Sequence, residues 1–338
     1  MHKPKKIAIG LQGGGSHGAF SWGVLDALLA DDRIDIVGLS GTSAGGMNAA
    51  ATLQGFNKGG REGARAELRR FWEMVHKTTA ESAMRPTPFK SMMGSHSLRG
   101  SPVYAWMNMM RDFYSPYELN PLDINPLKTL VHDFFDLDIL HKRSKMKVFL
   151  CATQVRTGKL HIFKGKELTE SALLASACLP SLFRAVEVDG EFYWDGGYVG
   201  NPAIYPLIYN CPTRDIAIIQ ITQAHRELIP NTADAIADRH QEITYNACLM
   251  HEIRAIYFIS KMVEKGIVND KSIKILNLHV IRDREFFEEL DLSTAMNTDW
   301  NFLLQLFEAG KRSGEKWLED HYDDIGVRSS AQIEEDFI

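Results

Sequence analysis

The sequence predicts an α/β sandwich, in which helices pack on a sheet of buried strands. Short apolar runs recur along the chain, and segments with helical spacing of apolar residues lie between them. The chain has 338 residues, of which 45% are hydrophobic. It is therefore long enough to bury the core of one large domain or of two small ones.

The first 80 residues alternate regularly between the two kinds of element. Strands are expected at 5–12 and 34–39, and helices at 18–30, 44–56 and 61–77. Residues 85–127 differ, because their prolines exclude any long helix.

The alternation resumes near residue 146. Strands are expected at 146–153, 160–163, 185–194, 214–222 and 274–281, with a short helix at 169–178 and a long one at 232–265. The long helix is too polar at alternate heptad positions for a coiled-coil seam, so we expect it to pack on the sheet. The acidic tail, 329–338, is expected to be frayed.

Composition and charge argue against several classes of protein. Acidic residues outnumber basic ones by 43 to 38, and neither a basic tract nor zinc-ligand spacing is present, so no nucleic-acid partner is expected. Four widely separated cysteines fit reduced thiols. The basic start is followed by an apolar run too short for a signal peptide, and no run of about 18 apolar residues occurs. We therefore expect a soluble, cytoplasmic protein.

A glycine-rich loop follows the first expected strand, in the stretch GLQGGGSHGAFSWGVLDALL at 10–29. Gly13, Gly15 and Gly18 satisfy the G-x-G-x-x-G pattern of dinucleotide-binding folds, but such folds need an acidic residue at the end of the second strand. Here that strand ends in Gly-Leu-Ser, and the nearby aspartates precede or begin it. No nucleotide cofactor is therefore expected, and the loop is free to serve another anion.

The motif G-T-S-A-G at 41–45 stands in place of the missing acid. The pattern alone is common, but here it follows an apolar strand and opens a helix. Small flanking residues allow a sharp turn that would present Ser43 as a nucleophile. A serine in an ordinary strand-to-helix turn is the alternative.

A serine nucleophile needs a base and needs donors for the oxyanion that its attack creates. The N–H groups of Gly13, Gly14 and Gly15 can approach such an oxyanion closely, and the following helix adds the positive end of its dipole. Asp195, in EFYWDGGYVGNPA, follows an apolar run and precedes two glycines, which predicts a carboxylate at a strand end. Asp-Gly-Gly is also a common turn, and a purely structural glycine loop is possible too.

Three short motifs, taken in order, resemble the patatin-like phospholipase family: G-G-G-S-H-G at 13–18, G-T-S-A-G at 41–45 and D-G-G at 195–197. The resemblance implies a three-layer α/β/α sandwich with a mostly parallel central sheet. It also implies a Ser-Asp dyad without a catalytic histidine, which hydrolyses acyl esters without metal or nucleotide.

Carried onto the matching positions, the resemblance makes Ser43 the nucleophile and Asp195 its base. The amides of Gly13, Gly14 and Gly15 would form the oxyanion hole. This chain has His17 where the family usually has Arg or Lys, a departure that leaves the backbone donors in place.

The expected organisation follows from the extent of the resemblance. We expect a catalytic domain over 1–225, with 85–127 as a lid or substrate insertion. A helical C-terminal region over 226–338 would pack on that domain or complete it. The expected activity is that of a phospholipase A or lysophospholipase, acting on phospholipid or another acyl ester with transient contact to a membrane surface.

Three other functions stay open. A Ser-His-Asp carboxylesterase would need a histidine from those after the aspartate, of which His279 at the end of an apolar strand is the most suitable; the others are His225, His240, His251 and His321. An acyltransferase would pass the acyl group to an alcohol or thiol. A non-catalytic lipid-binding protein would keep only the fold.

Soft apolar side chains gather in residues 84–117. Because methionine packs adaptably against varied apolar shapes, this segment is a candidate acyl-chain pocket or interfacial lid. An irregular segment that only covers the core is the alternative. The segment holds Met84, Met92, Met93, Met107, Met109 and Met110, with Tyr104, Trp106, Phe113, Tyr114 and Tyr117 among or just beyond them.

Overall fold

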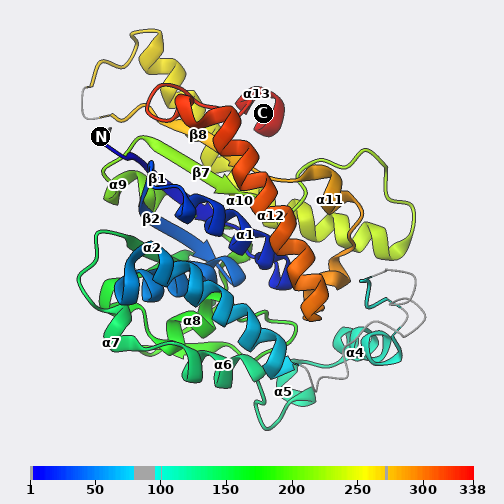
Figure 1. Cartoon of the computed structure of the whole chain (residues 1–338). Helices are drawn as coiled ribbons and strands as arrows, with labels where there is room; N and C mark the ends of the chain where they lie inside the picture. Colours follow the sequence, from blue (N-terminus) through cyan, green and yellow to red (C-terminus); the bar gives the residue numbers. More distant parts are fainter. Residues whose placement is uncertain (1–2, 80–95, 100, 271–272) are drawn as a thin grey trace.

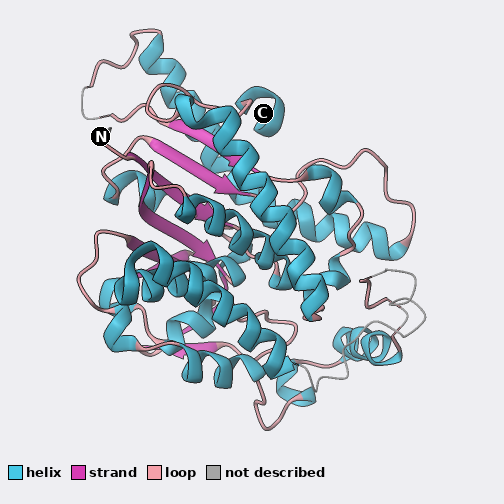
Figure 2. Ribbon diagram, in the orientation of Figure 1, coloured by secondary structure: helices cyan, strands magenta, loops and turns pink. Residues whose placement is uncertain are grey.

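A computed structural model describes residues 3–79, 96–99, 101–270 and 273–338. A twisted sheet runs through the middle of the molecule, with helices on either side (Figures 1 and 2). The strands are β1 Lys5–Leu11, β2 Ile34–Thr42, β3 Lys147–Gln154, β4 Leu160–Lys164, β5 Val186–Val188, β6 Glu191–Asp195, β7 Asp215–Ile219 and β8 Asn277–Ile281.

The sheet is mixed but mostly parallel in its central part. Its order is β5-β6-β3-β2-β1-β7-β8, with β4 paired to β3. The pairs β1–β2, β1–β7, β2–β3 and β7–β8 are parallel, whereas β3–β4, β3–β6 and β5–β6 are antiparallel. The last parallel strand, β8, comes from the region beyond residue 225.

Two hydrophobic cores lie on opposite faces of this sheet. Successive side chains of a strand point to opposite faces, so Ile7, Ile9 and Leu11 of β1 join one core and Ala8 joins the other. The first core is covered by α1 Gly18–Ala30, α2 Ala44–Thr79 and α12 Trp300–His321. The second is covered by α9 Tyr205–Asn210, α10 Ala233–Glu264 and α13 Ile333–Phe337. The predicted three-layer α/β/α sandwich is confirmed.

The remaining helices are short. They are α4 Pro102–Phe113, α5 Pro116–Leu119, α6 Pro126–Phe134, α7 Leu137–Leu140, α8 Glu170–Ser176 and α11 Arg284–Glu288, with 3₁₀ turns η1 Gly15–His17, η2 Gly165–Glu167, η3 Gly196–Tyr198, η4 Leu292–Met296 and η5 Tyr322–Asp324. The three helices that begin in the described part of 85–127 have 4 to 12 residues. Each begins with a proline, which suits the first helical turn. None of the described helices is long and apolar enough to cross a membrane.

Most expected elements are present, with three informative differences. β2 runs on to Thr42 instead of ending at residue 39, because Gly41 and Thr42 still pair with β3. The expectation of a frayed tail is wrong: Phe337 is buried, and Asp336 pairs with Arg282. The third difference is α12, which lies in the C-terminal region expected to be helical but whose bounds were not predicted. It lies along α1 (Figure 1), where the Phe307 ring is 4.1 Å from that of Trp22.

The proposed lid segment is described only in part. Met84, Met92 and Met93 lie outside the described residues. Helix α4 stands away from the sheet (Figure 1) and exposes several large apolar side chains. Trp106 is 56% exposed, Met109 54% and Phe113 77%. Their spacing of three and four residues places these three side chains on one face of the helix.

Candidate active site

Sheet pairing brings Ser43 and Asp195 together from strands far apart in the sequence. Strand β4 occupies one side of β3 along residues 149–153. The other side is shared: β2 pairs there up to Thr42 opposite Cys151, and β6 pairs there from Asp195 opposite Ala152. The two strands run toward each other, so that the residue after β2 and the last residue of β6 meet. Ser43 and Asp195 both line the same cavity.

Ser43 forms a sharp turn between β2 and α2. Its φ of 54° lies in the left-handed region, which is uncommon for a residue with a side chain. The Ser43 N–H donates hydrogen bonds to two oxygens of Ser176, at the end of α8: the carbonyl at 3.0 Å and the hydroxyl at 3.1 Å. The Ser43 carbonyl already accepts an α2 hydrogen bond from Met47. The turn is therefore held on both sides, and strain of this kind is typical of functional positions.

The glycine loop packs directly against this turn. A side chain at Gly13 would meet the Thr42 carbonyl at 2.7 Å and the Ser43 Cβ at 2.9 Å. The Gly13 N–H donates to Asn201 Oδ1 at 2.7 Å. Within the described chain, no acceptor is paired with the N–H groups of Gly14 and Gly15. Of the three amides, these two are the ones left to bind an anion.

Asp195 is a buried carboxyl group, with 2% of the residue exposed. Burial raises the pKa of Asp195 to about 7, because a charge is costly away from water, while hydrogen bonds from the Gly197 N–H and the Ser43 side chain lower this pKa. The Gly197 bond is 2.7 Å long. The carboxyl group is therefore tuned to exchange a proton near neutral pH.

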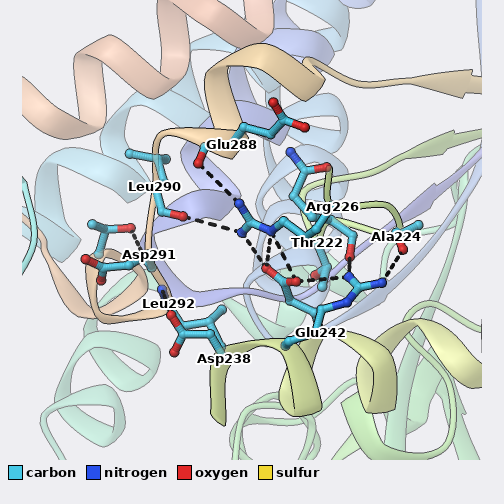
Figure 3. A network of polar contacts seen from close by, with 12 residues as sticks. Thr222, Ala224, Arg226, Asp238, Glu242, Glu288, Leu290, Asp291 and Leu292 are labelled. Carbon is cyan, nitrogen blue, oxygen red and sulfur yellow. Dashed lines mark hydrogen bonds and ion pairs between the residues drawn. The ribbon is translucent and has the colours of Figure 1, made fainter. Parts of the chain in front are cut away.

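A cavity of about 1110 Å³ connects the glycine loop, Ser43 and Asp195 with the C-terminal region. Leu179, Leu182 and Ile221 are among its apolar lining residues. Charged side chains, among them Arg226, also line it. Figure 3 shows Arg226 between the buried Glu242 and the main-chain carbonyls of Glu288 and Leu290.

The histidines after Asp195 are dispersed. One ring nitrogen of His279 is hydrogen-bonded to Asp215 and the other to Ser330. His279 does not line the cavity. His321 contacts Asp324, and His225 contacts Glu227. Of the five histidines, His240 alone is among the described residues that line the cavity.

His17, in the first turn after β1, also lines the cavity. Its ring is buried beside Phe287, with ring centroids 5.4 Å apart. Burial lowers the pKa of His17 to about 4, with Arg226 acting in the same direction and Asp291 opposing it. The ring is therefore neutral at physiological pH. It does not supply the positive charge that an Arg or Lys at this position would carry.

Residues 10–208, more than half of the chain, match the family model described as patatin-like phospholipase. The chain belongs to the patatin-like phospholipase family. The predicted family is thus confirmed, and it is a family of lipid acyl hydrolases. The matched part of this patatin-like chain runs from β1 to α9 and contains Ser43, Asp195 and the glycine loop.

Among solved structures, the patatin-like chain is similar to VipD from Legionella pneumophila. The two share 15% sequence identity with a TM-score of 0.39, over 91% of this chain and 67% of that one. No curated protein matches the chain significantly. The family assignment depends on the match over residues 10–208 alone.

The structure adds polar residues that the sequence did not single out. Ser176 fixes the Ser43 turn, Asn201 binds the glycine loop, and Thr294 contacts His17 at 2.7 Å. For Asn201, the Asn-Pro pair soon after the D-G-G motif was a sequence signal that could have pointed to this residue. Nothing in the sequence indicated Thr294, which lies about 280 residues from its partner. In the described chain, no cluster of three His, Cys, Asp or Glu side chains could hold a metal ion.

Proposed function

We propose that this protein is a lipid acyl hydrolase of the phospholipase A or lysophospholipase type, working through a Ser43–Asp195 dyad. The observation that carries the proposal is the meeting of β2 and β6 on one side of β3. It sets a strained serine and a buried carboxyl group against one cavity, with the glycine loop beside them. This is the set of groups that acyl transfer through a serine requires.

In the first half of the reaction, Ser43 Oγ attacks the carbonyl carbon of the ester and Asp195 takes its proton. The negative charge that develops on the carbonyl oxygen is stabilised by the Gly14 and Gly15 amides. Collapse of this intermediate breaks the bond to the alcohol. The protonated Asp195 then donates its proton to the leaving oxygen, and Ser43 carries the acyl group.

In the second half, Asp195 takes a proton from water as the water oxygen attacks the acyl-enzyme. Collapse of this second intermediate breaks the bond to Ser43 Oγ, Asp195 returns the proton to Ser43, and the fatty acid is released. A carboxyl group with a pKa near 7 suits both roles, because it is readily deprotonated and readily protonated at neutral pH. The Gly13 N–H keeps its hydrogen bond to Asn201, and this bond holds the loop in place. Gly13 would join the oxyanion hole only if that bond were exchanged.

The substrate we propose is a phospholipid or another long-chain acyl ester. The apolar residues that line the same cavity as Ser43 suit an acyl chain. We propose further that α4 contacts the membrane surface, because Trp106, Met109 and Phe113 expose apolar area on one face. A soluble short-chain ester would need only the catalytic groups.

Labelling with a serine-reactive fluorophosphonate, followed by product analysis, tests this function. The wild-type protein should be labelled and should release fatty acid from mixed phospholipids. Ser43→Ala should abolish both with its melting temperature nearly unchanged. Ser313→Ala, on α12, is the control and should behave as wild type. Labelling that persists in Ser43→Ala would refute the proposal, whereas acyl transfer to an added alcohol without net hydrolysis would indicate a transferase.

A further inference from the structure

The glycine loop is flanked by a part of the chain that the family match does not include. The match ends at residue 208, whereas η4 spans Leu292–Met296. η4 packs on η1, the turn that begins at Gly15, the last glycine of the loop. A Cβ built on Gly15, whose φ is 57°, would lie 2.2 Å from the Ala295 carbonyl oxygen. Any side chain at Gly15 would therefore push the loop and η4 apart.

A directed hydrogen bond joins the same two segments. His17 Nε2 lies 2.7 Å from Thr294 Oγ1, and the Thr294 hydroxyl lies 2.6 Å from the Asp291 carbonyl. The carbonyl can only accept, so the Thr294 proton is directed to it. His17 Nε2 must therefore carry the proton and donate it to Thr294. This fixes the tautomer of a buried, neutral imidazole.

The segment that carries Thr294 is itself anchored from the opposite side. Figure 3 shows this network: Arg226 donates to the carbonyls of Glu288 and Leu290, at 3.2 and 3.5 Å. The carboxylate of Glu242 pairs with Arg226 at 2.5 Å and is itself buried. Next along the chain, the Leu292 N–H donates to Asp238 at 3.3 Å. Residues 288–292 are thus held to α10, which limits how far η4 can move.

We propose that Thr294 is a positioning residue for ester hydrolysis, holding the glycine loop in its working geometry through His17. The inference rests on the proposed function, in which the Gly14 and Gly15 amides bind the oxyanion. Those two residues lie between the Asn201 bond at Gly13 and the Thr294 bond at His17. One bond comes from inside the matched region and the other from outside it. Thr294 itself touches no reacting atom.

Thr294→Val keeps the shape of the side chain but removes its hydroxyl. A loop that is free to shift by a fraction of an ångström should lower kcat for a soluble ester by about 10- to 100-fold. The KM should stay within about twofold, because the acyl pocket is unchanged. Thr294→Ser restores the hydroxyl and should recover most of kcat.

Thr298→Val is the matched control. Thr298 also bonds through its hydroxyl, to Thr79 at 2.6 Å, but it lies outside the contact between η4 and the loop. Its variant should keep kcat. A Thr294→Val protein that is folded and retains kcat within about twofold overturns the inference. So does an equal loss of kcat in Thr298→Val, or a failure of Thr294→Ser to recover activity.

NMR of protein with ¹⁵N-labelled histidine tests the contact without using activity. The wild type should show a slowly exchanging Nε2–H signal, assigned through its absence in His17→Asn. The signal should persist in Thr294→Ser and exchange rapidly in Thr294→Val. A wild-type His17 protonated on Nδ1 would overturn the inference even if Thr294→Val does not fold. If wild-type protein neither hydrolyses esters nor reacts with the fluorophosphonate, the proposed function fails, whereas this measurement still tests the contact.

Discussion

Gly13 and Asn201 are joined by a hydrogen bond of 2.7 Å between the glycine amide and the asparagine Oδ1. The bond ties the glycine loop to the loop that follows Asp195. Asn201 Nδ2 is buried and has no hydrogen-bond partner among the described residues. Turning the side-chain amide around would set two donors against each other at Gly13, so its orientation is fixed by the bond. Asn201 thereby links the proposed oxyanion loop to the base.

Asn201→Ala should therefore impair turnover more than substrate binding. The Gly13 N–H would lose its acceptor, and an unpaired buried donor costs about 1–3 kcal/mol. We expect kcat for a soluble ester to fall by about 10- to 100-fold at nearly constant KM, with a lowered melting temperature. Asn210→Ala is a suitable control, because the Asn210 side chain also bonds the main chain, donating to the Pro206 carbonyl, but lies on α9. An Asn201→Ala protein that keeps the wild-type kcat would show that Asn201 does not contribute to the site.

Asp195→Asn should lower kcat by about 10²–10⁴-fold, as is typical for the loss of a general base. The amide has nearly the same shape but cannot take the Ser43 proton. His240→Ala and His279→Ala should each keep most of the activity, since neither is part of the proposed dyad. Initial rates on a soluble ester, with circular dichroism to confirm folding, check this. Activity lost in folded His240→Ala would instead point to a histidine-dependent serine hydrolase.

The pKa of Asp195 predicts the acidic limb of the pH profile. Since the base must be ionised, kcat/KM should fall about tenfold per pH unit below pH 7 and level off above it. If the acidic limb instead gave an apparent pKa about two units lower, a group other than Asp195 would control the reaction.

The same shift has a consequence for stability. Between its unfolded pKa, near 3.8, and about 7, the folded protein holds the Asp195 proton more tightly than the unfolded chain. The stability from this group is therefore present at low pH and is lost as pH rises through that window. Asp195→Asn should remove this loss, which melting curves of both proteins at about pH 5 and pH 8 can measure. Equal pH dependence in the two proteins would contradict the shift.

The exposed face of α4 should matter for membranes and not for chemistry. Met109→Asp with Phe113→Asp would place two charges on that face, which should weaken binding to phospholipid vesicles and slow phospholipid hydrolysis. Hydrolysis of a short soluble ester should be unchanged. Phe258→Asp, on α10, serves as the control, because the exposure of Phe258 lies between those of Met109 and Phe113. Both activities falling together, with a lower melting temperature, would show that the α4 face is part of the core.

Local patterns were sufficient to predict the α/β order of this chain. Apolar runs located β1, β2, β3, β7 and β8, and the glycine pair 59–60 lies where α2 departs from helical geometry between the two expected helices. Glycine and serine motifs next to strand ends indicated the candidate residues, because such ends gather at one edge of a parallel sheet. These signals are short-range, and each can be recognised in fewer than about 15 residues.

The rest depended on contacts between distant residues. No spacing in the sequence indicates that β2 and β6 share one side of β3, or that the Gly13 amide would be bound by Asn201. The acidic composition of the tail argued against packing. In the structure, Arg282 and Arg284 both pair with Asp336, and the neighbouring Phe337 is buried. Opposite charges about 50 residues apart cancel a repulsion that composition alone suggested.

The place of β1 between β2 and β7 has a practical consequence for anyone shortening the chain. The family match ends at residue 208, and β7 begins at Asp215. A fragment cut at that boundary would leave Ala8–Leu11 with unpaired N–H and C=O groups along one side of an apolar strand. Such a flank is a template for pairing with another chain. We therefore expect the fragment to aggregate, and a usable shorter version would have to retain β7 and β8.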